Sequence, residues 1–501
     1  MIELGLQRIF RLLERTPLKW RAIHVAGTNG KGSICHYISA MLNHYNTSKY
    51  QSETQSDRLN VGRFTSPHLV DRWDCISLRH QPVSFEVFDR VEREVKKRNE
   101  QERINASEFE LLTATAFEIF TLERLNVGII EVGMGGRLDA TNIIGRLPEG
   151  GVPDPETLIC SLANPESFRP RPLVTAIAKI GLDHQGFLGN SIQEIAREKA
   201  GIIKPTVPVV LDYSNASAAL EVLEDAAGDN EIVTFDNMQL PELKGNSNDV
   251  LKLLQPHSTA QGAHGAHQMA DHQRQNLSVA FRAAWTALRR AGALGKGNPI
   301  KHIENRQELL SSLASGMLDA AVDVKFPGRQ QSINIESLTG RQANIILDGA
   351  HNAQSAQALA KFVTQQFGAP GEASRQPVTW VVAASDSKDV REIVEPLLNG
   401  GDSIVAVEFG PVDGMPWVNA MPAAKIEAVV AQLAQERKRP IATHSCGAKV
   451  KDALQEAVRL AGNGPLVVAG SLYLVGDVFR LLRHSEAYPG GELEEGLHMT
   501  A

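Results

Sequence analysis

Short apolar runs alternate with longer amphipathic stretches along most of the chain. In the first half the runs are bounded by loop-forming residues, as strands buried on both faces should be. They predict strands at Ala22–Ala26, Val127–Val132, Val174–Ile177 and Val207–Leu211. Helical periodicity predicts helices at Lys31–His44, Phe109–Glu123 and Ser191–Ala200. Strands that alternate with helices are typical of a parallel sheet with helices on its faces.

A second series of the same kind follows Pro327-Gly328-Arg329. Its apolar runs predict strands at Asn344–Leu347, Thr379–Ala384, Ile404–Val407 and Leu466–Ala469. We therefore expect an α/β protein with a domain boundary near 325–335. A P-loop-type parallel-sheet ATPase domain should cover residues 1–328, and a smaller, Rossmann-like domain should cover residues 329–501.

Three polar segments interrupt the pattern, at 46–60, 146–170 and 238–272. They are rich in loop-forming or polar residues, which predicts surface insertions or mobile loops. The third segment contains four histidines, at His257, His264, His267 and His272. No cysteine lies near them and their spacing fits no compact metal motif, so we expect a solvated loop there rather than a zinc site.

Composition narrows the range of functions. The net charge of -7 argues against a broad nucleic-acid interface, although a local phosphate site needs only a few donors. The four cysteines are far apart, which indicates reduced thiols, and no apolar run approaches the length of a membrane span. The short, basic and amphipathic N-terminus leaves a mitochondrial address open, but its two glutamates argue against one. We expect a cytoplasmic protein with no membrane partner.

The sharpest local motif is HVAGTNGKGS at residues 24–33, in which an expected strand runs into a glycine-rich turn and then a helix. Backbone N–H groups in such a turn converge on phosphate oxygens, and Lys31 can reach the β and γ phosphates. The strict P-loop pattern is not met, because position 25 is Val and position 32 is Gly. A purely structural turn is the alternative.

Two further motifs follow the ends of predicted strands. Glu131 ends the second strand, where a buried carboxylate is costly unless it is paired, and Mg²⁺ beside a phosphate loop is a natural partner. A helix cap, or a pair with Arg137, is the alternative. Asp183 and His184 follow the third strand, so they should lie at the same sheet edge as Lys31 and Glu131. In the second domain, Asp348 follows a strand and could orient ribose or catalytic groups.

Together these segments resemble the folylpolyglutamate synthase and dihydrofolate synthase branch of the Mur ligase family. The resemblance is carried by HVAGTNGKGS (24–33), FTSPHL (64–69), EFELLTATAF (108–117), EVGMGGRLDATN (131–142), IGLDH (180–184), EKAGIIK (198–204), PGR (327–329), LDGAHN (347–352) and AGSLYLVG (469–476). The nine segments span nearly the whole chain in the family's order. The segment GMPW (414–417) is similar to fungal-type dihydrofolate synthases.

The resemblance implies two bound groups, ATP and Mg²⁺. The ATP loop would be Gly27, Thr28, Asn29, Gly30, Lys31, Gly32 and Ser33. Further nucleotide contacts would be Asn276, Arg329 and Asp348. The Mg²⁺ ligands would be Ser66, Glu131 and His184. Lys199, which would otherwise be a surface lysine, matches a lysine that is carbamylated in relatives and then holds a second Mg²⁺.

The resemblance also implies the reaction: ATP-dependent ligation of L-glutamate to 7,8-dihydropteroate through an acyl phosphate. We expect the protein to be a monomer. The pterin-site residues would be Leu138, Asp139 and Ala140. The residues nearest the chemistry would be Lys31, Lys199 and His351. Alternatives are a folylpolyglutamate synthase acting on reduced folates, a bifunctional enzyme, and a cell-wall Mur ligase, which FTSPHL and LDATN disfavour. A nucleotide-hydrolysing switch protein is a more distant alternative, and it would turn over nucleotide without glutamate.

Overall fold

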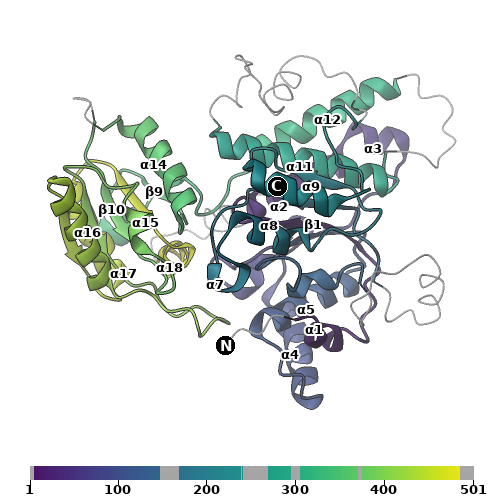
Figure 1. Cartoon of the computed structure of the whole chain (residues 1–501), viewed down its shortest axis with the longest axis horizontal. Coiled ribbons are helices and arrows are strands. Elements are labelled where there is room, and N and C mark those ends of the chain that lie inside the picture. Colours follow the sequence, from purple (N-terminus) through teal and green to yellow (C-terminus); the bar gives the residue numbers. More distant parts are fainter. Residues whose placement is uncertain are drawn as a thin grey trace. The chain divides into compact units, whose positions relative to one another are not determined.

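The computed structural model describes residues 5–146, 169–238, 240, 269–294, 305–370 and 375–485. They form two compact units. The first contains the described residues up to Pro67 and within Cys75–Val324, and the second contains His68–Asp74 and the described residues from Lys325 on. Each unit has a sheet with helices packed on it (Figure 1). Nearly all of 146–170 and 238–272 lies outside the described residues, including His257, His264 and His267.

The sheet of the first unit has, in its described part, seven strands in the order β4-β3-β2-β5-β1-β6-β7. The strands are β1 (Arg21–Ala26), β2 (Val61–Phe64), β3 (Ile76–Leu78), β4 (Gln81–Pro82), β5 (Val127–Glu131), β6 (Val174–Ile177) and β7 (Val209–Leu211). The five strands from β2 to β7 in this order are parallel, and β3 and β4 add an antiparallel edge. The four predicted strands are therefore present, with ends shifted by two residues at most.

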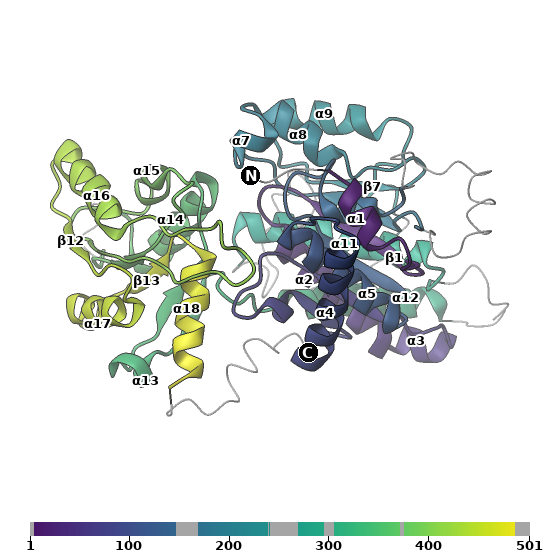
Figure 2. The same cartoon turned by 90° about the horizontal axis from the view of Figure 1, so that it is seen from below.

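Helices cover both faces of this sheet (Figure 2). On one side, α2 (Lys31–Thr47) and α11 (Asp271–Arg290) contact the central strands, and α12 (Arg306–Val322) packs on α2. On the other, α8 (Ile192–Ala200) and α9 (Ser217–Ala227) join an apolar cluster with β1, β6 and β7. The remaining helices are α1 (Gln7–Leu12), α3 (Lys49–Thr54), α4 (Phe85–Gln101), α5 (Glu108–Leu122), α7 (Gln185–Leu188) and the 3-10 turns η1 (Arg72–Cys75) and η2 (Ala140–Ile143). Among the described residues, no helix is long and apolar enough to cross a bilayer.

The expectation that 46–60 is a surface insertion or mobile loop is wrong for its first half. Helix α2 continues to Thr47, and α3 follows after Ser48, whose side chain accepts from the Gln51 N–H and caps the helix. Tyr50 is only 2% exposed and lies 6.5 Å from the Tyr45 ring. The segment has too few apolar residues to show helical periodicity, because its order comes from packing against the distant helix α12.

The sheet of the second unit has the described strand order β12-β11-β10-β13-β9-β8, and only β8 is antiparallel. Its strands are β8 (Gln331–Ile333), β9 (Ile345–Leu347), β10 (Thr379–Val382), β11 (Ser403–Ala406), β12 (Ala442–Ser445) and β13 (Leu466–Ala469). Its helices are α13 (Glu336–Thr339), α14 (Ala353–Phe367), α15 (Val390–Val394), α16 (Ala423–Arg437), α17 (Val450–Ala461) and α18 (Leu472–Arg483). This is the doubly wound arrangement expected from the second series of apolar runs.

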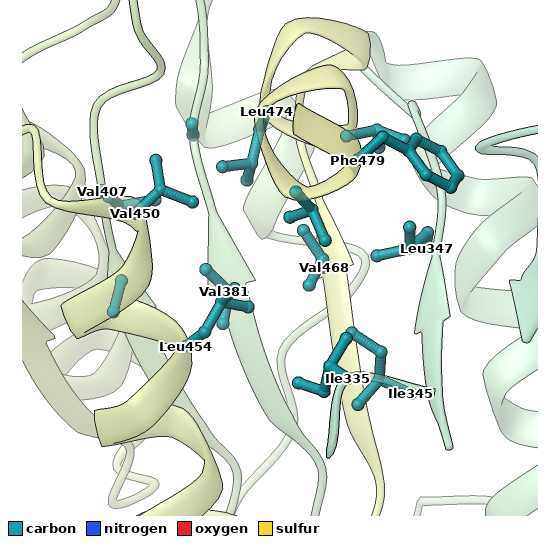
Figure 3. Close-up of a cluster of buried hydrophobic side chains, with 14 of the residues drawn as sticks. Ile335, Ile345, Leu347, Val381, Val407, Val450, Leu454, Val468, Leu474 and Phe479 are labelled. Atoms are coloured by element: carbon teal, nitrogen blue, oxygen red, sulfur yellow. The ribbon is translucent and has the colours of Figure 1, made fainter. Parts of the chain in front are cut away.

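Successive side chains of each strand in this sheet enter two separate cores, because the side-chain period of a strand is two. Figure 3 shows the first core, in which Val381 and Val468 of the sheet lie between Leu454 of α17 and Leu474 of α18. The neighbouring Trp380, Val382 and Val467 belong to the second core, with α14, α15 and α16. Burial on both faces explains why these strands are continuous apolar runs in the sequence.

The segment His68–Asp74 belongs to the second unit although it lies far from it in sequence. Val70 is part of the core shown in Figure 3, and its carbonyl accepts from the Arg480 guanidinium. The Asp74 carboxylate accepts the N–H groups of Leu69, Val70 and Asp71, which fixes the turn. The FTSPHL motif is thus divided between the units, which its local pattern does not reveal.

Candidate active site

The order of the strands brings the predicted phosphate and metal motifs to one edge of the first sheet. Strand β1 lies between β5 and β6, and all three are parallel. Glu131 is the last residue of β5, Gly27 follows β1, and His184 comes after β6. Because the carboxyl ends of parallel strands meet at one edge, ligands of open α/β sheets bind there.

The glycine-rich loop is held in place from two sides. The N–H groups of Thr28 and Asn29 both donate to the Lys179 carbonyl, at 2.8 and 3.2 Å. Gly30 has a positive φ of 88°, and a Cβ placed on it would lie 2.1 Å from Oδ1 of Asn276 on α11. Only glycine fits this close approach. The structure therefore places Asn276, 246 positions later in the chain, directly against the expected ATP loop.

Lys31 and Glu131 lie next to each other at the start of α2. The Lys31 Nζ is 3.9 Å from Glu131 Oε1, and the backbone N–H of Ser66 donates to Glu131 Oε2 at 3.2 Å. The Glu131 residue is 4% exposed. A Cβ on Gly32 would lie 3.4 Å from Glu131 Oε2, so the glycine keeps space open beside the carboxylate. A carboxylate oxygen with open space beside it fits Mg²⁺, which prefers oxygen ligands.

Lys199 is buried under the loop and points at it. Its Nζ donates to the Gly27 carbonyl at 2.9 Å. Burial, followed by the nearby charge of Lys31, lowers the pKa of Lys199 to about 7, against an upward effect of Asp183 and Asp139. A substantial fraction of the amine is therefore in its neutral, nucleophilic form near neutral pH. The expectation of a surface position for this lysine, as the alternative to a site role, is wrong, because α8 packs that face against the sheet.

Asp139 is the buried member of the expected substrate loop. Its carboxylate accepts from the backbone N–H of Met134, and from both the N–H and the hydroxyl of Thr141. Burial raises the pKa of Asp139, and the bond from the Thr141 side chain opposes that rise. Its neighbour Ala140 is also buried, whereas Leu138 is half-buried. The three residues therefore form an ordered turn at the end of the Glu131 motif.

His184 lies in the left-handed region, with a φ of 52°, and its side chain is 45% exposed. Its N–H donates to Asp183 Oδ1 at 2.8 Å. The side chains of His, Cys, Asp and Glu form no group of three or more that could hold a metal, within the ranges that the structure describes. The metal roles of Ser66, Glu131, His184 and Lys199 stay a prediction.

In the second unit, Asp348 follows β9 and is buried. Its carboxylate accepts from the N–H groups of Gln330 and Ala350, both at 2.8 Å. Burial raises the pKa of Asp348, while the charge of Arg329 lowers it. His351 Nδ1 lies 2.8 Å from the Gly349 carbonyl, which orients the ring at the start of α14. The structure thus joins Arg329 and Asp348 electrostatically and places His351 on the adjoining turn.

Sequence reasoning missed a set of buried polar residues beneath this edge: His24, Thr141, Asn142 and Lys204. His24 Nε2 lies 2.9 Å from the Thr141 hydroxyl, and Lys204 Nζ donates to Asn142 Oδ1 at 2.6 Å. The available signal was a polar residue inside an apolar run, since His24 lies between Ile23 and Val25. Such a residue is costly to bury unless its hydrogen bonds are made.

Comparison with known proteins gives a consistent set of relatives. The family model of the dihydrofolate synthetase C-terminal domain matches residues 331–481. The probable dihydrofolate synthetase of Schizosaccharomyces pombe is 34% identical, with 96% of this chain and 99% of that protein covered. The dihydrofolate synthetase of Saccharomyces cerevisiae is 31% identical, with 96% and 98% covered.

Solved structures show the same fold. The folylpolyglutamate synthase of Mycobacterium tuberculosis, complexed with ADP and AMPPCP, aligns with a TM-score of 0.65 at 22% identity, covering 95% of each chain. The bifunctional folylpolyglutamate synthase/dihydrofolate synthase of Yersinia pestis, complexed with AMPPNP and a Mn ion, aligns with a TM-score of 0.62 at 22% identity. It covers 96% of this chain and 94% of that one.

Proposed function

We propose that this chain, which belongs to the dihydrofolate synthetase and folylpolyglutamate synthase family, is a dihydrofolate synthase that joins L-glutamate to 7,8-dihydropteroate with ATP. The observation that carries this proposal is the end-to-end similarity to two fungal dihydrofolate synthetases. The arrangement of Lys31, Glu131 and Lys199 around one glycine-rich loop is a second line of support, which does not depend on similarity to relatives. A cytoplasmic location and a monomeric state remain predictions.

An amine cannot displace an oxygen directly from a carboxylate, because oxide is a poor leaving group. The carboxylate must therefore first be phosphorylated, so that phosphate can leave instead. One carboxylate oxygen of dihydropteroate attacks the γ-phosphorus of ATP, and ADP leaves. The neutral amine of glutamate then attacks the acyl carbon, phosphate leaves, the nitrogen loses one proton to water or to the departing phosphate, and the amide remains. Lys31 offsets the negative charge on the transferred group, and the N–H groups at the start of α2 face the phosphates. Positioning and charge neutralisation supply most of the catalysis in such transfers.

Ser66, Glu131 and His184 are the residues that would hold Mg²⁺. When bound, the ion would neutralise phosphate charge and fix the triphosphate for in-line transfer. Asn276, Arg329 and Asp348 would contact the nucleotide, with residues 1–328 as the ATP-binding domain and 329–501 as the glutamate-ligase domain. Leu138, Asp139 and Ala140 would contact the pterin, and His351 would act near the transferred phosphoryl group.

We expect Lys199 to react with CO₂ and to hold a second Mg²⁺ as its carbamate. The neutral amine adds to the carbon of CO₂ and loses one proton, so a cation that repels metals becomes an oxygen ligand. The lowered pKa of Lys199 favours this reaction near neutral pH, since only the neutral amine is nucleophilic. Incubation with ¹³C-bicarbonate should give a carbamate carbon resonance that is absent from Lys199→Met. An active, bicarbonate-exposed enzyme that shows only the free amine would rule the carbamate out.

Purified protein incubated with ATP, glutamate and either dihydropteroate or a reduced folate tests the function. We expect product from dihydropteroate and phosphate release that depends on both other substrates. Activity on reduced folate alone would instead identify a folylpolyglutamate synthase. Activity on both would identify a bifunctional enzyme, as is the Bacillus subtilis relative, named dihydrofolate synthase/folylpolyglutamate synthase, at 27% identity. ATP turnover without glutamate would contradict ligation and favour a switch protein.

A further inference from the structure

His24 occupies the centre of the first sheet, on the strand that leads into the ATP loop. It is fully buried, and its strand β1 lies between β5 and β6. Burial, followed by the charges of Lys204 and Arg146, lowers the pKa of His24 well below its usual value, so the ring is neutral. One ring nitrogen of a neutral imidazole then carries a proton and the other does not.

The hydrogen bonds of Asp139 decide which nitrogen of His24 carries that proton. The Asp139 carboxylate receives three donors: the Met134 N–H at 2.9 Å, the Thr141 N–H at 3.0 Å and the Thr141 hydroxyl at 2.5 Å. A carboxylate with three donors is in its ionised, accepting form. The Thr141 hydroxyl therefore donates a hydrogen bond to Asp139, and its oxygen accepts one from His24 Nε2–H at 2.9 Å.

The other ring nitrogen of His24, Nδ1, indicates that the bond from Nε2 to Thr141 is the reason for a histidine at this position. His24 Nδ1 is buried and has no hydrogen-bond partner among the described residues. A buried polar atom without a partner costs free energy, and a leucine of similar size would fill the same space without that cost. Packing alone thus favours an apolar residue, whereas the bond to Thr141 requires a donor.

We infer that His24 is a positioning residue for the substrate loop: through the Thr141 hydroxyl it holds the Asp139 carboxylate in the orientation that binds the pterin. This inference rests on the proposed function, in which Asp139 contacts dihydropteroate. Because His24 and Gly27 lie on one strand and its loop, the same backbone places both the ATP loop and the substrate loop. A second tie, from Lys204 to Asn142, fixes the far end of the same turn.

Two matched pairs of variants test this role by steady-state kinetics. His24→Leu removes the donor, and His24→Gln keeps an amide N–H near the position of Nε2. Thr141→Val removes the hydroxyl, and Thr141→Ser keeps it. We expect His24→Leu and Thr141→Val each to raise KM for dihydropteroate by about tenfold, with KM for ATP within about twofold, since one buried hydrogen bond is lost. His24→Gln and Thr141→Ser should restore KM for dihydropteroate.

Ser39→Ala is the matched control, because Ser39 Oγ makes a comparable buried bond to His80 Nδ1, at 2.8 Å, elsewhere in the same unit. This variant should lower thermal stability without raising KM for dihydropteroate relative to KM for ATP. The double variant His24→Leu/Thr141→Val should be no worse than Thr141→Val alone, because both changes break one chain of bonds. If His24→Leu does not fold, the Thr141 pair gives the same readout.

Equal KM values for dihydropteroate in His24→Leu and His24→Gln, or in Thr141→Val and Thr141→Ser, would overturn the inference. So would equal increases in both KM values, because a merely structural change has no reason to spare ATP. A wild-type enzyme that does not use dihydropteroate would contradict the proposed function instead. The two failures are therefore distinguished by the wild-type assay, which precedes the variants.

Discussion

A Lys31→Ala enzyme is expected to lose ligation by at least about 10²–10³-fold, the usual cost of removing one group that stabilises developing charge. The Lys31 Nζ lies at the head of α2, 3.9 Å from Glu131, where the phosphates of ATP would be held. The backbone N–H groups of the loop would remain, but they carry no full charge to offset the transferred phosphoryl group. Product formation from dihydropteroate, glutamate and saturating ATP measures the effect.

Lys49→Ala is the matched control for this variant. Lys49 is an exposed lysine at the start of α3, so its removal should change neither the rate nor the fold. Circular dichroism and elution volume should be the same for both variants and the wild type. A folded Lys31→Ala enzyme with the wild-type rate would remove Lys31 from the mechanism.

Replacing Glu131 by glutamine should also lower the ligation rate, by about 10²-fold or more at millimolar Mg²⁺. Glutamine keeps the volume and an oxygen that can accept the Ser66 N–H, and it removes only the charge that Mg²⁺ requires. The variant should need a much higher Mg²⁺ concentration than the wild type to reach half of its maximal rate. Glu131→Asp, which keeps the charge on a shorter side chain, should retain partial activity.

The stability of the Glu131→Gln protein separates a lost metal ligand from a lost fold. Glutamine keeps the size of the side chain and the acceptor for the Ser66 N–H, so the metal-free variant should still fold and unfold in one cooperative transition, as the wild type does. Glu110 is equally buried, at 4% exposure, but forms a 2.9 Å salt bridge with Arg8. Glu110→Gln should show the opposite result, with lower stability and an unchanged rate. A fully active Glu131→Gln enzyme would refute the metal assignment.

The eight predicted strands could be recognised because they are buried on two faces. Runs such as Val174–Ile177 and Leu466–Ala469 have the predicted ends, since they are mostly apolar and are bounded by loop residues. The strands β3, β4, β8 and β12 were not predicted, because they are short and lie at or next to a sheet edge. Strand β2 is internal but was also missed, since its four residues include the polar Arg63. Helix α3 was missed for a related reason: Tyr50 is buried by a helix more than 250 positions away, and no local pattern records that contact.

The candidate site, like the fold, could be predicted from the sequence only in part. That Lys31 and Glu131 would meet followed from two strand ends at one edge of a parallel sheet, and the 3.9 Å separation confirms the geometry, while their roles remain predictions. The contact of Asn276 with Gly30 and the bond of Lys199 to Gly27 could not be worked out from periodicity or spacing. Each joins residues more than 170 positions apart, and the resemblance alone pointed to them.

By itself the sequence predicted eight of the strands that the structure describes, the strand ends at which phosphate- and metal-binding motifs lie, and the family to which the chain is similar. These features are local, because burial on two faces and the shape of a glycine-rich turn leave a mark in consecutive residues. The tertiary structure alone decided the burial and lowered pKa of Lys199, the place of His68–Asp74 in the second unit, and the bonds from His24 through Thr141 to Asp139. Those depend on which distant side chains share a low-dielectric interior, and only the packed fold sets that environment.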